Sequence, residues 1–106
     1  MNPLTNNEKK QLRKIGHDLK PVVTVAENGL SENVLQELNR ALEDHELIKA
    51  KLVIPDRKMR AEVAADICRQ CNASNVQSIG QVVLLYRSSK KPSTRLSNIL
   101  RASSQR

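Results

Sequence analysis

Segments with helical periodicity alternate with β-branched runs along this chain, and this alternation limits the possible folds more than any other feature. The helical segments begin at Thr5, Ser31 and Asp56, and the strand-like segments cover residues 22–26, 47–54, 76–79 and 82–86. Strands that alternate with helices pair in parallel through right-handed crossovers, whereas a two-residue link makes a hairpin. The sequence therefore predicts an α/β fold, a small α-β-α-β-α-β-β module with a four-stranded mixed sheet.

The ends of the predicted elements are marked by capping and turn residues. Thr5 and Glu8 have the spacing of a capping box, in which each side chain bonds the other residue's backbone N–H. Pro21 prevents the first helix from continuing. Residues 72–75 are polar and read as a loop. The link Gly80-Gln81, with glycine first, predicts a type II′ hairpin.

Tyr86 is the single aromatic residue in a chain of 106 residues, since the sequence has no Phe and no Trp. A core must therefore be built from Leu, Ile, Val and Ala. Proteins that bind RNA by stacking bases use several exposed rings. With one ring, in an apolar strand, base stacking is disfavoured, and any recognition of RNA is expected to use phosphates, 2′-hydroxyls and shape instead.

The positive charge is concentrated at the two ends of the chain. The net charge is +7, with five Lys or Arg against two acidic residues in residues 1–21, and five against none from Ser88 onward. Such clusters are typical of proteins that bind phosphates, although charged termini can also serve solubility alone. We expect a folded domain at residues 1–88, followed by a basic tail at residues 89–106 that is mostly disordered when free.

The loop between the first strand and the second helix is the most suggestive local feature. A strand-to-helix junction presents backbone N–H groups and a positive dipole, and Gly29 lets a sugar–phosphate approach closely. Glu27 opposes anion binding, and an ordinary βα turn is an equally good interpretation. The predicted RNA contacts are Lys10, Lys14, Lys20, Asn28, Gly29 and Arg87. Lys49 and Lys51 are weaker candidates, because they can simply line an exposed sheet face.

Cys68 and Cys71 form a C-x-x-C pair, which leaves a thiol or zinc protein as the alternative function. The pair falls near the C-terminus of a predicted helix, where the dipole opposes a thiolate. A zinc site needs two further ligands, and His17 and His45 are far away in sequence. No acid–base or nucleophilic set and no nucleotide-binding motif is present. We therefore expect no enzyme, no cofactor and no small-molecule substrate.

Neither a membrane span nor a secretory leader is predicted. No apolar run approaches the ~18 residues that cross a bilayer. The first eight residues are polar and contain no hydrophobic region of a signal peptide. The expected location is the cytoplasm, and the sequence leaves the oligomeric state open.

Several stretches, in order, resemble the YhbY family of bacterial single-domain CRM (chloroplast RNA splicing and ribosome maturation) proteins. These stretches are Leu19-Lys20-Pro21-Val22-Val23, Asn28-Gly29-Leu30-Ser31, His45-Glu46-Leu47-Ile48-Lys49-Ala50-Lys51, Ile79-Gly80 and Leu84-Leu85-Tyr86-Arg87. The resemblance covers about residues 4–88. It implies a fold similar to the C-terminal domain of translation initiation factor three.

The resemblance also implies a function. It implies an RNA-binding protein that docks on structured ribosomal RNA of large-subunit precursors and takes part in ribosome biogenesis. The family's G-x-x-G loop is the implied RNA contact. Here Gly29 matches its second glycine, while Ala26 stands at the first and Glu27 adds a negative charge. More of the affinity is then expected from Lys20, the N-terminal helix and the tail.

Overall fold

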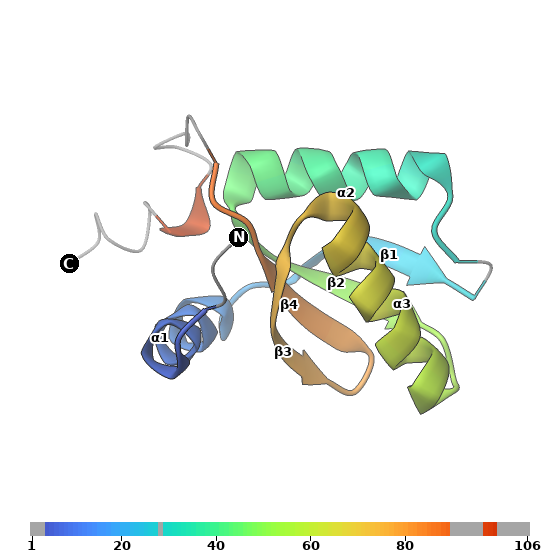
Figure 1. Ribbon diagram of the computed structural model, residues 1–106, viewed down its shortest axis with the longest axis horizontal. Helices are drawn as coiled ribbons and strands as arrows, with labels where there is room; N and C mark the ends of the chain where they lie inside the picture. The colour runs from blue at the N-terminus through green and yellow to red at the C-terminus, as the bar shows by residue number, and fades with distance from the viewer. Residues whose placement is uncertain (1–3, 28, 90–96, 100–106) are drawn as a thin grey trace.

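The computed structural model describes residues 4–27, 29–89 and 97–99. The elements run in the predicted order: α1 (Asn6–Gly16), β1 (Pro21–Ala26), α2 (Glu32–His45), β2 (Leu47–Val53), α3 (Arg57–Cys71), β3 (Ser74–Ile79) and β4 (Val82–Tyr86). The strands form one four-stranded sheet in the order β1-β2-β4-β3 (Figure 1). β1 and β2 are parallel, and β4 is antiparallel to both of its neighbours. The predicted α/β fold with a mixed sheet is confirmed.

The sheet is covered by helices on both faces, but to different extents. α2 and α3 pack on one face over a large aliphatic cluster that includes Val25, Leu38, Ile48 and Ile67, all nearly inaccessible to solvent. α1 packs on the other face over a smaller cluster. In it Leu12, Leu47, Val76 and Leu84 are buried, and they are surrounded by the partly buried Leu4, Ile15, Leu19, Tyr86 and Ile99. The molecule is therefore a three-layer sandwich whose second helical layer is a single helix.

The predicted caps are present. Thr5 Oγ1 accepts from the N–H of Glu8 at 3.1 Å, and Glu8 Oε1 accepts from the N–H of Thr5 at 3.0 Å. Ser31 Oγ accepts from the N–H of Val34, and Asp56 Oδ1 accepts from the N–H of Lys58. These bonds satisfy backbone donors that a helix cannot satisfy internally, which is why the helices begin where the sequence indicates.

The third strand differs from the prediction. β3 begins at Ser74, so Ser74 and Asn75 are not loop residues but pair with Tyr86 and Leu85. β3 is an edge strand with a register shift between Asn75 and Gln77, and most of it is polar. An edge strand with a bulge shows little hydrophobic alternation, so its first half has no strand pattern.

The turn between β3 and β4 follows the prediction. Gly80 has a φ of 57°, whereas Gln81 has no positive φ. A positive φ at the first turn residue alone is the type II′ pattern.

The chain after β4 returns to the junction between α2 and β2. Glu46, at this junction, has a positive φ of 62° and is buried. Its carboxylate accepts from the N–H of Ser89 at 2.9 Å and from Ser97 Oγ at 2.6 Å, and Asn98 Nδ2 donates to Leu47 O. Within the tail predicted at residues 89–106, Ser89, Ser97 and Asn98 are therefore held by hydrogen bonds to Glu46 and Leu47. Residues 90–96 and 100–106 lie outside the described part.

No helix in the described part of the chain has the length and hydropathy needed to cross a membrane.

Candidate nucleic-acid interface

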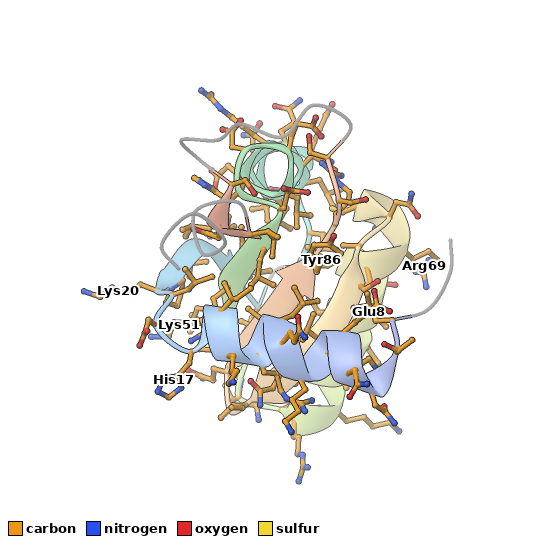
Figure 2. All side chains as sticks on the ribbon, turned by 90° about the vertical axis from the view of Figure 1, so that its left-hand side faces the viewer. Glu8, His17, Lys20, Lys51, Arg69 and Tyr86 are labelled. Atoms are coloured by element: carbon orange, nitrogen blue, oxygen red, sulfur yellow. The ribbon has the colours of Figure 1, made fainter. Side chains whose placement is uncertain are left out.

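α1 turns its basic side chains away from the sheet. Leu12 is buried against the smaller cluster, whereas Lys10, Arg13 and Lys14 are exposed. Glu8 is engaged in the cap, and its hydrogen bonds with Thr5 lower its pKa. The outer face of α1 therefore presents cations to solvent, and Figure 2 shows this helix in front of the sheet.

The connection from α1 to β1 adds further cations to the same side of the molecule. Lys20 is exposed at the start of β1 and extends outward on the same side as His17 and Lys51 (Figure 2). Lys49 is half-buried, and its Nζ donates to the carbonyl of His17 at 3.3 Å, which ties this connection to β2. Two of the predicted contacts, Lys14 and Lys20, thus lie on either side of this connection, Lys14 in the last turn of α1 and Lys20 just before β1.

α1 leaves part of its sheet face uncovered. Ala50 and Leu52 point into the large cluster, so the intervening Lys51 points to the α1 side, next to Thr24 in the β1–β2 register. Val53 is 41% exposed on that side. We call this surface, formed by Thr24, Lys51 and Val53, the open sheet face. Lys51, a weak candidate from the sequence, lies at its centre.

The Gly29 loop lies at the other end of β1. Gly29 has a φ of 87° and donates its N–H to Ala26 O at 3.0 Å. Apart from Gly29 and its chain neighbours, no atom of the described residues lies within 4 Å of the position of an added Cβ. Asn28 lies outside the described residues. β1 has six residues, which at roughly 3.3 Å per residue separates this loop from Lys20 by about 20 Å (Figure 1). The predicted contacts therefore form two groups.

The charges around the Gly29 loop are mixed. Glu27 is exposed, and Glu32 occupies the first turn of α2, where both carboxylates oppose a phosphate. Arg57 and Lys58 are exposed at the start of α3. Because β1 and β2 are parallel, with Ala26 beside Val53, the starts of α2 and α3 emerge at the same edge of the sheet.

Arg57 and Lys58 were not among the predicted contacts. The sequence did contain a signal for them. Once residues 22–26 and 47–54 are predicted to be parallel strands, the loops that follow the two strands must lie at the same edge of the sheet.

Arg87 does not match its predicted role as a phosphate contact. Its guanidinium donates to Asn39 Oδ1 at 2.8 Å, to Cys71 O at 2.9 Å and to Asn39 O at 2.9 Å, and it pairs with Glu43 at 3.5 Å. These contacts join the end of β4 to α2 and to the C-terminus of α3. Arg87 is therefore a structural residue, and we leave it out of the interface.

Cys68 and Cys71 lie in the last turn of α3, as predicted. Burial raises the pKa of both thiols; the Cys71 thiolate further raises that of Cys68, and the Arg87 charge lowers that of Cys71 to a smaller extent. Reactive thiols need a lowered pKa. Among the described residues, no group of three or more His, Cys, Asp or Glu is placed to hold a metal ion. This geometry is typical of packing cysteines.

Tyr86 packs against the smaller cluster and is half-buried. Burial raises the pKa of its phenol, with the charge of Glu46 as a second cause. The ring is thus part of the α1 side of the core.

Comparison with known proteins places these features in a family context. Residues 4–87 match the profile of the CRS1 / YhbY (CRM) domain. The chain is 54% identical over 98 residues to a protein of Pseudomonas aeruginosa named "probable RNA-binding protein", with 92% of this chain and 94% of the relative covered. It is 40% identical over 96 residues to a protein of Haemophilus influenzae named "RNA-binding protein", covering 91% and 97% of the two chains.

A solved structure shares the fold. The solution structure of a hypothetical protein from Staphylococcus aureus, described as a candidate RNA-binding protein, superimposes with a TM-score of 0.75 at 30% identity. The match covers 83% of this chain and 92% of that one. The similarity therefore extends over the domain as a whole rather than over a local motif.

Proposed function

This chain belongs to the CRS1/YhbY (CRM) domain family, and we propose that it binds structured RNA without catalysing a reaction. The relatives' names support RNA as the partner. The observation that carries the proposal is the basic surface that joins the outer face of α1 to the open sheet face. Lys10, Lys14, Lys20 and Lys51 are exposed on it.

The physical basis of binding is the attraction between these side chains and RNA phosphates. Each lysine that neutralises a phosphate releases a counterion, so the affinity falls with salt. The surface has no exposed aromatic residue for stacking among the described residues, since Tyr86 packs on the core. Recognition therefore depends on phosphate positions and on the shape of a folded RNA.

Gly29 and Asn28 form the second part of the proposed interface. An open approach and a positive φ at Gly29 favour close contact by a sugar–phosphate. Arg57 and Lys58 supply the cations that this edge needs to offset Glu27 and Glu32. RNA that reaches both parts must cross the open sheet face.

The finer proposal is that the RNA is ribosomal and belongs to precursors of the large subunit, so that the protein acts in ribosome biogenesis in the cytoplasm. The resemblance to the YhbY family supports this assignment. Cosedimentation with large-subunit precursors in sucrose gradients is the expected result. Sedimentation only with mature subunits, or only at the top of the gradient, would contradict it.

The RNA-binding proposal is tested with two variants that each lose two positive charges, from different sides of the domain, and therefore have the same net charge. The Lys20→Gln/Lys51→Gln variant is compared with Arg40→Gln/Arg69→Gln, which removes the same charge from α2 and α3. Arg69 lies far from Lys20 and Lys51 in Figure 2 and pairs with Asp66. The affinity for a ribosomal RNA fragment is measured from about 50 to about 200 mM salt, because the affinity of phosphate-contacting proteins falls steeply over this range.

We expect the lysine variant to lower the slope of log affinity against log salt by about 2, and the arginine variant to leave it unchanged. Equal slopes in the two variants would mean that the RNA does not bind on the α1 side. A flat salt dependence in the unaltered protein would contradict phosphate-driven binding altogether.

A further inference from the structure

A hollow of about 320 Å³ lies beside α1 on the uncovered side of the sheet. Its apolar wall is aliphatic and comes from the α1–β1 connection, the start of β1, β3 and β4: Leu19, Pro21, Ile79, Val82 and Leu84. Ile79 is 65% exposed, the most exposed of the large hydrophobic residues in the described part of the chain. An aliphatic surface of this kind, left open to water, favours a partner that covers it.

The hollow follows from how α1 ends. Gly16, the last residue of α1, contacts Leu84, and the chain then turns toward β1 through His17 and Leu19. The bond from Lys49 Nζ to His17 O holds this turn against β2. Because β3 and β4 continue past the end of α1, the side chains of Ile79 and Val82 have no helix above them.

The rim of the hollow is basic and polar. Lys20, Lys49, His17 and Gln77 line it, and no carboxylate of the described residues does. Asp18 is adjacent in sequence and exposed, but it is not a lining residue. Cations around an aliphatic floor match a ligand whose outer part is anionic and whose inner part is flat and apolar. A nucleotide has this distribution, with phosphate at the rim and base inside.

The size fits one base rather than a longer segment. A volume of about 320 Å³ is at the lower end of the roughly 300–1,000 Å³ range of small-ligand pockets. Aliphatic side chains such as Leu and Ile can contact base faces directly, as they do in the apolar wedges that minor-groove binders insert between base steps. Gln77 has an amide that can both donate to and accept from the edge of a base.

We propose that this hollow holds one unpaired nucleobase of the bound RNA, against Ile79 and Val82, while Lys20 and Lys49 contact the flanking phosphates. The proposal rests on the proposed function. It adds a preference that phosphate contacts alone do not produce: RNA with a bulged nucleotide binds more tightly than a perfect duplex of the same length.

The experiment uses two RNA hairpins that differ by one bulged 2-aminopurine nucleotide, and three forms of the full chain. The forms are the unaltered protein, Ile79→Ser and Met59→Ser. Met59 is 44% exposed on α3, which covers the opposite face of the sheet, so it is a matched exposed-to-polar control. Both substitutions are at exposed positions, and circular dichroism checks that the variants fold.

We expect the unaltered protein and Met59→Ser to prefer the bulged hairpin by on the order of tenfold, because the base covers aliphatic surface, and to change the 2-aminopurine fluorescence. Ile79→Ser is expected to lose that preference while keeping its affinity for the perfect hairpin. Equal affinity of the unaltered protein for the two hairpins would overturn the base pocket and leave the RNA-binding function standing. Absence of binding to both hairpins at low salt would overturn the function itself.

Two other occupants are separated by the same variants. Binding of a polyglutamate peptide that is lost in Ile79→Ser, without a preference for the bulged hairpin, would assign the hollow to an acidic protein segment. Self-association in sedimentation equilibrium that is lost in Ile79→Ser would assign it to a second copy of this chain. Either result would overturn the proposal.

Discussion

Gly16 lies so close to Leu84 that a Cβ on Gly16 would stand 2.7 Å from each of the two methyl carbons of Leu84. Real Cβ atoms do not approach other carbons at that distance, so glycine is what allows the last turn of α1 to rest on β4. Leu84 is buried and belongs to the smaller cluster beneath α1. The contact therefore fixes where α1 stops covering the sheet and where the proposed interface begins.

Gly16→Ala is expected to lower the free energy of unfolding by about 1–3 kcal/mol, the usual cost of overpacking a well-filled core. Urea denaturation measures the change. A double-mutant cycle with Leu84→Ala is the control, because removal of the Leu84 methyls makes room for the new methyl. The combined variant should therefore lose less than the sum of the two single losses. Strict additivity would show that the two side chains do not compete for this space.

Arg87→Ala is expected to destabilise the fold by about 2 kcal/mol, since Asn39 and Cys71 lose the donor to their polar groups. Arg87→Lys should rescue little, because an ammonium group cannot reproduce the several directed bonds of a guanidinium. At a temperature where both variants are folded, their RNA affinity should equal that of the unaltered protein. A weakened RNA complex with unchanged melting temperature would restore Arg87 to the interface.

Gly29→Asp and Gly29→Asn form a pair that differs in charge but hardly in size. Both place a side chain at a φ of 87°, where Asn and Asp are the best tolerated of the residues with a Cβ. If phosphate passes this loop, the Asp variant should bind RNA several-fold more weakly than the Asn variant at low salt. Equal affinities, measured by fluorescence anisotropy, would move the RNA away from the loop.

Two truncations separate the structural and the electrostatic parts of the C-terminal segment. Removal of residues 100–106 deletes Arg101 and Arg106 but keeps the bonds at Glu46, so the melting temperature should stay unchanged. Removal of residues 89–106 also deletes Ser89 and Ser97, which donate hydrogen bonds to the buried Glu46 carboxylate. At about 1 kcal/mol per lost bond, a fall of several degrees is expected. Equal melting temperatures for the two truncated chains in calorimetry would show that these bonds do not stabilise the domain.

The free energy of unfolding should decrease at alkaline pH. The pKa values of Cys68, Cys71 and Tyr86 are raised above the ordinary values of 9.0 for the thiols and 10.0 for the phenol. The folded chain therefore retains protons that the unfolded chain has already released. The free energy of unfolding should be insensitive to these groups below about pH 8 and should decrease as the pH rises above their ordinary values.

Denaturation with urea across this pH range measures the effect, and Cys68→Ala/Cys71→Ala should show a smaller decrease. The same raised pKa predicts slow alkylation of both cysteines at neutral pH. Fast alkylation at pH 7 would instead support the thiol function that the C-x-x-C spacing suggested.

The order of elements could be predicted from the sequence because most signals were local. The Thr5 and Glu8 pair and the Ser31 and Asp56 caps act within three residues of the helix start. The start of β3 could not be predicted, because Ser74 and Asn75 are held by pairing with β4 rather than by a pattern of their own.

The interface was harder to predict because it depends on distant contacts. Arg87 donates to Asn39, 48 residues away in sequence, and to Cys71, 16 residues away. Its neighbours in the sequence therefore give no sign that its guanidinium is bound within the fold. Lys51 was a weaker candidate from the sequence, because how much of the sheet α1 covers depends on the tertiary packing. Lys14 and Lys20, next to the same uncovered surface, remain predicted contacts.

The six-residue length of β1 sets the minimum length of an RNA that can contact both parts of the proposed interface. An oligonucleotide much shorter than about 20 Å can reach either the lysines at the start of that strand or the glycine turn at its end, but not both. Dissociation constants obtained with very short RNAs would then describe half a binding surface, and the gain on lengthening the RNA past that span would report how strongly the two halves cooperate.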